Sequence, residues 1–60
     1  MKASDISPGM QCTVVLLGKR AKAWVEYLSG PLMNVGGVTW VVRTDGGQWL
    51  RLPARRIHEA

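Results

Sequence analysis

The chain has little with which to build a disulfide-linked or metal-stabilised fold. Its 60 residues contain one cysteine and one histidine. Cys12 alone cannot form an internal disulfide, and Cys12 and His58 are not repeated at a zinc-type ligand spacing. We therefore expect no metal and no cofactor. Because a chain of this length buries only about 60% of its unfolded surface, self-association, for example as a homodimer, is the expected additional support.

Long apolar runs are also missing. No run approaches the roughly 20 residues of a membrane-spanning helix, and residues 1–8 lack the apolar segment of a signal peptide. Cys12 lies in a Val/Leu run with no basic residue within two positions, which indicates a buried, unreactive thiol in a reducing compartment. We expect a soluble, cytoplasmic protein that does not contact a membrane.

Groups for acid–base catalysis are few and scattered. The titratable candidates are Asp5, Glu26, Asp45, His58 and Glu59. No general acid–base pair is evident among them, and neither Gly-Gly pair is followed by the Lys-Ser/Thr of a phosphate-binding loop. The sequence therefore predicts that the protein is not an enzyme.

Basic side chains outnumber acidic ones by eight to four, which gives a net charge of +4. On so small a body, this charge produces a positive field that favours anionic partners. The same balance also serves solubility alone. Seven of the eight basic residues form two clusters in the sequence, one of Lys19, Arg20 and Lys22, and one of Arg43, Arg51, Arg55 and Arg56.

Alternation of apolar and polar residues predicts β-strands. Met10 to Leu16 alternate directly after the turn signal Pro8-Gly9. A second strand alternates from Lys22 to Tyr27 and stops at Ser29-Gly30-Pro31. A helix over residues 21–28 is disfavoured, because Trp, Val and Tyr prefer strands.

One domain, residues 1–60, contains these strands. Around them we expect a lead-in over residues 1–8, an apolar connector over residues 29–37 and a solvated tail over residues 58–60. Leu32, Met33 and Val35 make the connector too apolar for a freely solvated loop. It is expected to cap the core or to lie in a partner or subunit contact.

The segment from Val38 to Ile57 predicts a hairpin around Asp45-Gly46-Gly47. Its register matters, because a shift of one residue moves every side chain to the other face. A two-residue loop at Asp45-Gly46 places Trp49 in the core. A three-residue loop with Gly47 left-handed separates apolar from polar side chains better. It pairs Trp40 with Leu52, Val42 with Leu50, Val41 with Arg51, and Arg43 with Trp49.

The three-residue loop fixes the faces of the hairpin. Its outer face consists of Thr39, Val41, Arg43, Trp49 and Arg51. Pro53 then suits a short, tight turn of the 3-10 type, after which Ile57 returns to the core in a brief last strand. The full predicted core is Cys12, Val14, Leu16, Val25, Tyr27, Trp40, Val42, Leu50, Leu52 and Ile57.

Three of these features resemble the Src-homology-3-like small barrels, a group that includes bacterial KOW-type and Tudor-like modules. They are the Pro8-Gly9 lead-in, the Asp45-Gly46-Gly47 hairpin, and the hydrophobic-Pro-x-x-x-hydrophobic ending from Leu52 to Ile57. The resemblance covers Met10 to Ile57. It implies an all-β fold, a small five-stranded barrel with a short 3-10 turn before the last strand.

The chain departs from the members of that group that bind proline-rich peptides. Its first loop is only Gly18-Lys19-Arg20-Ala21 and carries no acidic residue, and Arg56 stands where their groove tyrosine would be. Proline-peptide recognition needs an aromatic groove, so we do not expect it here. Type II dihydrofolate reductases are similar barrels with a Val-Gln-Ile-Tyr segment before a proline. Here Trp49-Leu50-Arg51-Leu52 occupies that place and Gln48 is out of register, so an oligomeric reductase is the most distant alternative.

Tryptophan and arginine together suggest a binding surface on the outer face. Aromatic rings can stack on bases while guanidinium groups neutralise phosphates, and the same residue types dominate protein interfaces. Arg43 opposite Trp49 also allows a purely structural cation–π pair, and the tryptophans could instead pack within the chain or in a homo-oligomer. We expect a non-catalytic, nucleic-acid-associated regulatory module, and the alternative is a protein-binding adaptor or inhibitor of phage or mobile-element type. The candidate site residues are Lys19, Arg20, Lys22, Trp24, Arg43, Trp49, Arg51, Arg55 and Arg56.

Overall fold

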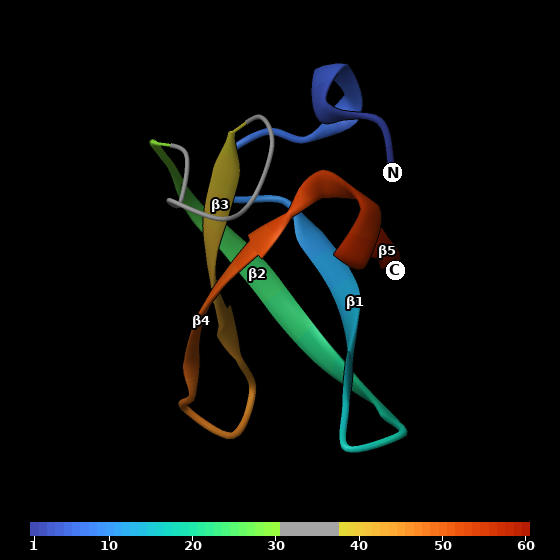
Figure 1. The fold of residues 1–60 in the computed structure, drawn as a ribbon. Helices are drawn as coiled ribbons and strands as arrows, with labels where there is room; N and C mark the ends of the chain where they lie inside the picture. The colour runs from blue at the N-terminus through green and yellow to red at the C-terminus, as the bar shows by residue number, and fades with distance from the viewer. Residues whose placement is uncertain (31–37) are drawn as a thin grey trace.

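Five strands and two 3-10 turns make up the fold in the computed structural model, which describes residues 1–30 and 38–60 (Figure 1). The strands are β1 (Gln11–Leu16), β2 (Lys19–Ser29), β3 (Thr39–Thr44), β4 (Trp49–Pro53) and β5 (His58–Glu59), and the turns are η1 (Ala3–Asp5) and η2 (Ala54–Arg56). All pairings are antiparallel, in the order β4-β3-β2-β1-β5. The all-β class and the 3-10 turn before the last strand are confirmed. Of the predicted connector, residues 31–37 lie outside the described residues.

The sheet does not close into the predicted barrel. Among the described strands, β4 pairs with β3 and β5 pairs with β1, so β4 and β5 are the two edges. Pro53 ends β4 without a backbone N–H to donate to a further strand. The chain then turns through η2 and reaches β1, where β5 forms two residue pairs. No helix in the described residues is long and apolar enough to cross a membrane.

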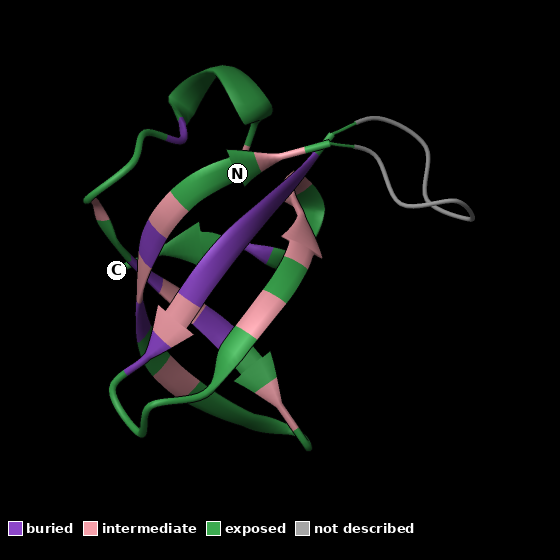
Figure 2. Ribbon diagram, turned by 90° about the vertical axis from the view of Figure 1, so that its left-hand side faces the viewer, coloured by how far each residue is buried: buried purple, intermediate pink, exposed green. Residues whose placement is uncertain are grey.

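The core lies on the inner face of the sheet. The predicted core residues Cys12, Val14, Val25, Trp40, Val42 and Ile57 are buried, and Leu16, Leu50 and Leu52 are half-buried against them. Ile6 and Ala23 complete the buried cluster. Each large aliphatic side chain that is fully buried contributes about 1.5–3 kcal/mol. Figure 2 shows burial along most of β3, which is covered on both faces.

Tyr27 is the predicted core residue that the structure places elsewhere. Val25 pairs with Val42, and Tyr27 pairs with Val41, the next residue of β3, so Glu26 is the extra residue of a β-bulge. A bulge adds one extra residue to one of two paired strands. Every side chain that follows the extra residue in that strand therefore points to the face opposite the one that simple alternation predicts. Tyr27 therefore lies on the outer face, where 54% of it is exposed.

The hairpin of β3 and β4 has the predicted three-residue loop. The N–H of Thr44 donates to the carbonyl of Gln48 at 2.9 Å, and the N–H of Gly47 donates to the carbonyl of Thr44 at 2.9 Å. Gly47 has a φ of 89°, the left-handed conformation that this loop requires. The four predicted residue pairs are all present, which excludes the two-residue alternative.

The first hairpin is tighter than the sequence predicted. Leu16 pairs with Lys19, so the connection consists of Leu17 and Gly18, with φ angles of 50° and 78°. Three of the four residues assigned to a loop, Lys19 to Ala21, instead belong to β2. Two successive residues with positive φ match the twist of the flanking strands, so no longer loop is needed.

Candidate functional site

A row of four paired residues crosses the outer face of the sheet. Gln11 pairs with Trp24, Trp24 with Arg43, and Arg43 with Trp49. Directly opposed residues in antiparallel strands project to the same face. The register therefore brings three predicted site residues, from β2, β3 and β4, into one line.

Arg43 is the centre of this row. Its Cζ lies 5.9 Å from the centroid of the Trp24 ring, which forms a cation–π contact. Its Nε lies 3.5 Å from Oε2 of Glu26, the bulge residue. The cation–π pair thus uses Trp24, whereas the sequence suggested Trp49. Trp24 is half-buried, and Trp49 is the tryptophan left open to solvent, with 59% of it exposed.

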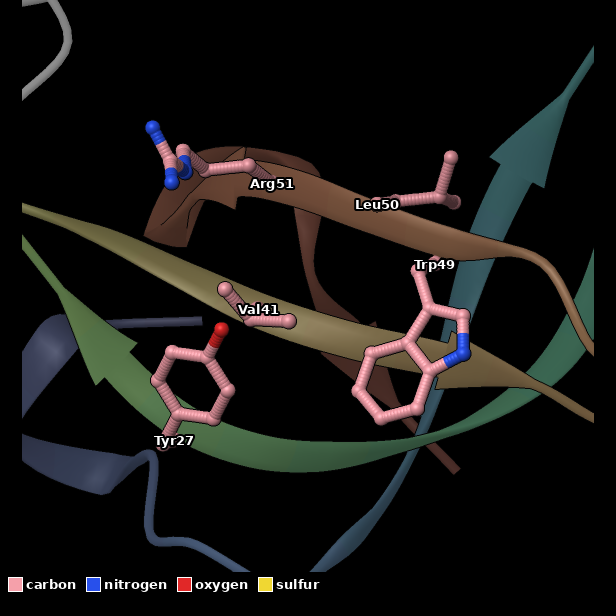
Figure 3. A pocket seen from close by; sticks show the side chains of 5 residues that line it. All are labelled: Tyr27, Val41, Trp49, Leu50 and Arg51. Carbon is pink, nitrogen blue, oxygen red and sulfur yellow. The ribbon is translucent and has the colours of Figure 1, made fainter.

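A second row lies beside the first. Tyr27 pairs with Val41, and Val41 with Arg51. Over this row lies an open hollow of about 220 Å³, lined by Tyr27, Val41, Trp49, Leu50 and Arg51. Figure 3 shows the rings of Tyr27 and Trp49 on either side of Val41, which is only 6% exposed. The hollow therefore has two exposed rings at its sides and an aliphatic floor between them.

Val41 and Thr39 lie on the predicted outer face but are not solvated there. Val41 sits between two aromatic rings, and Thr39 is fully buried. The hydroxyl of Thr39 donates to the carbonyl of Gly30 at 2.8 Å. The alternation of polar and apolar residues in β3 thus predicted correctly which face each side chain is on. It did not predict how far a side chain on that face is buried, because this depends on the neighbouring side chains.

The first basic cluster is divided by the alternation of β2. Arg20 pairs with Val15, and Lys22 pairs with Thr13. Both lie an even number of residues before Trp24 in β2, so their side chains point to the same face as that of Trp24. They therefore extend the outer face along β2, and both are exposed. Lys19 lies next to the two-residue turn, an odd number of residues from Trp24. Its side chain therefore points to the opposite face of β2 from those of Arg20 and Lys22.

The second basic cluster is divided as well. Arg43 and Arg51 lie on the outer face, in neighbouring rows. Arg55 and Arg56 are exposed residues of η2, the turn that joins β4 to β5, and are not part of the sheet. A charge cluster that looks continuous in the sequence is therefore two groups in the structure.

Tyr27 is the site residue that sequence reasoning missed. Its place in a strictly alternating run predicted burial, and the bulge at Glu26 overturns that prediction. The only signal in the sequence was a glutamate within an otherwise apolar strand end, which is too weak to locate a bulge. The aromatic content of the outer face is thus Trp24, Tyr27 and Trp49.

Cys12 lies on the opposite, inner face and is fully buried. Burial raises the pKa of its thiol above the ordinary value of 9.0, because a buried thiolate loses its hydration. The described residues contain no group of three or more His, Cys, Asp or Glu side chains that could hold a metal ion.

The outer face of β2, β3 and β4 is the surface on which candidate residues converge. We define it by its exposed or half-buried side chains: Arg20, Lys22, Trp24, Glu26, Tyr27, Arg43, Trp49 and Arg51. Such a surface can stack on planar groups and neutralise anions. Its function has to be inferred from its own geometry, because no family model, no curated protein and no solved structure matches the chain.

Proposed function

We propose that the protein is a non-catalytic module that binds nucleic acid through the outer face and serves a regulatory role. The observation that carries this proposal is the register of β2, β3 and β4, which lines up Trp24, Arg43 and Trp49. Including Arg43 in this row, the outer face has four cationic side chains and one carboxylate, that of Glu26. The face is therefore complementary to a phosphate backbone in charge and to bases in its aromatic rings.

Arg43 remains available for such a contact despite its ion pair. Its side chain is 43% exposed, and its contact with Glu26 is through Nε at 3.5 Å, while a guanidinium has five donors in a fixed fork. Lys22, Arg20 and Arg51 are exposed. Three to four phosphate contacts would give a slope of log affinity against log salt of about −2 to −4.

We also propose that the fold is a partly open member of the Src-homology-3-like group. The strand order β4-β3-β2-β1-β5 supports this assignment, as does η2 between Pro53 and the buried Ile57. The resemblance gives no function by itself, since one fold serves many functions. It is compatible with a binding surface on three neighbouring strands.

The test is a fluorescence-anisotropy titration of labelled single- and double-stranded DNA and RNA of mixed sequence, at about 50 and 200 mM salt. Two variants of equal charge are compared with the wild type. Lys22→Gln with Arg51→Gln removes two cations from the outer face, and Arg55→Gln with Arg56→Gln removes two from η2. Light scattering of the same samples gives the mass, which tests the expected homodimer.

The proposal predicts salt-sensitive binding that the outer-face variant weakens more than the η2 variant. Equal losses in both variants would mean that only the total charge attracts the ligand. Absence of binding at micromolar nucleic acid would overturn the proposal and favour a protein partner, for which Trp49 and Tyr27 are typical hot-spot residues.

A further inference from the structure

Two exposed aromatic rings on the outer face, those of Tyr27 and Trp49, take no part in the cation–π contact between Arg43 and Trp24. Tyr27 is 54% exposed and Trp49 is 59% exposed, whereas Trp24 is half-buried beneath the guanidinium of Arg43. Tyr27 and Trp49 flank the buried Val41 at the hollow of about 220 Å³ (Figure 3). Rings of this exposure next to an aliphatic floor are free to accept flat ligands.

The spacing of these rings restricts what can cover them. Tyr27 and Trp49 are on β2 and β4, separated by β3, and their rows are two residues apart. With strands about 4.8 Å apart and a rise of about 3.4 Å per residue, their backbones are roughly 12 Å apart. Bases stacked in one strand of a duplex are only about 3.4 Å apart. A pair of bases held one on each ring, at the spacing of these backbones, is farther apart than stacked neighbours in a duplex.

Contact with a ring also requires the flat side of a base. In a duplex, the flat sides are covered by neighbouring bases and only the edges face the grooves. A single strand can separate its bases and place each on a ring while its backbone follows a positive surface. The guanidinium of Arg51, in the row of Tyr27 and Val41, lies at the Tyr27 end of the hollow (Figure 3), where it can contact a phosphate beside the base on Tyr27.

We propose that the outer face recognises single-stranded nucleic acid, with Tyr27 and Trp49 each stacking on an unpaired base and Arg51 contacting the backbone beside the base on Tyr27. This inference rests on the proposed nucleic-acid function and specifies its ligand class. The bulge at Glu26 is essential to it, because the bulge places Tyr27 on the same face as Trp49.

The experiment compares labelled oligothymidine and oligouridine of about 12 nucleotides with a duplex of equal length, within the range of known single-strand site sizes. The proteins are the wild type, Tyr27→Ala and Trp49→Ala, with Tyr27→Phe and Trp49→Phe as controls that keep a ring. Thermal unfolding of each variant verifies that it is folded. The thymidine and uridine arms distinguish DNA from RNA as the preferred strand.

The wild type should bind at least one single strand more tightly than the duplex. Each alanine variant should weaken single-strand binding by about 5- to 150-fold, with little change for the duplex, and the phenylalanine variants should retain most of the affinity. Equal binding of single strand and duplex, unaffected by loss of the rings, would overturn this inference and leave the proposed function intact. No binding to any of these ligands would overturn both.

Discussion

Arg43 lies over the ring of Trp24, with its Cζ 5.9 Å from the ring centroid. The two residues are paired across β2 and β3, and Glu26 approaches the same guanidinium from the bulge. This arrangement fixes the direction of the Arg43 side chain on the outer face. It also means that Glu26 partly neutralises the most central cation of the proposed interface.

Replacing Glu26 by Gln should therefore strengthen binding of nucleic acid without much effect on stability. The ion pair is long and both side chains are substantially exposed, so the free energy of unfolding should change by less than about 0.5 kcal/mol. If Arg43 then contacts a phosphate, the salt slope should become steeper by about 0.7–0.9. Glu59→Gln, with the same charge change on β5, is the control. Equal gains in both variants would argue against a specific role for Arg43.

The left-handed conformation of Gly47 gives a prediction about the second hairpin. Gly47→Ala should lower the free energy of unfolding by about 1–2 kcal/mol, because a Cβ disfavours positive φ. For a domain of this size, the melting temperature should fall by about 4–8 °C per kcal/mol. Gly46→Ala is the matched control, since Gly46 does not have positive φ and its added Cβ would meet Thr44 Oγ1 at an ordinary 3.8 Å. Equal losses in both variants would contradict the assigned loop.

At Leu17 in the first hairpin, we predict a substitution that increases stability. Its φ of 50° is unfavourable for leucine, and its side chain is fully exposed. Leu17→Asn produces the Asn-Gly pair that two-residue hairpins prefer, and chemical denaturation should show a gain of about 0.5–1 kcal/mol. Val15→Asn removes another exposed aliphatic side chain from β1 at ordinary φ, and it should not stabilise. A loss of stability in Leu17→Asn would show that the turn differs from the one described.

Cys12 predicts a dependence of stability on alkaline pH. Its pKa is raised by burial, so the thiol of the unfolded chain ionises first. The contribution of Cys12 is fully present below pH 9.0 and is lost progressively as the pH rises from there through the folded-state value. The stability difference between wild type and Cys12→Ala should shrink over that range. A thiol reagent should also label the native protein far more slowly than the denatured one, and fast native labelling would contradict the burial.

Much of the fold was predictable because it depends on local signals. The register of the β3–β4 hairpin followed from alternation and from a glycine suited to the left-handed position, and the four predicted pairs are present. The turn after Pro53 and the return of Ile57 to the core followed from proline and the next apolar residue. For the same reason, the sequence predicted the outward-facing position of the candidate site residues in this hairpin, which are Arg43, Trp49 and Arg51.

The sequence by itself therefore determined the class of the fold, the final hairpin and the excess of positive charge. The first two follow from the alternation of apolar and polar residues and from the glycines of the turn, and the third follows from composition. The tertiary structure decided that Tyr27 faces outward, that Arg43 contacts Trp24, that Arg55 and Arg56 stand apart on η2, and that the sheet stays open. These features depend on how β2 pairs with β3 across the bulge and where β5 meets β1. Such pairings join residues distant in the chain, and their energies cannot be read from neighbouring residues alone.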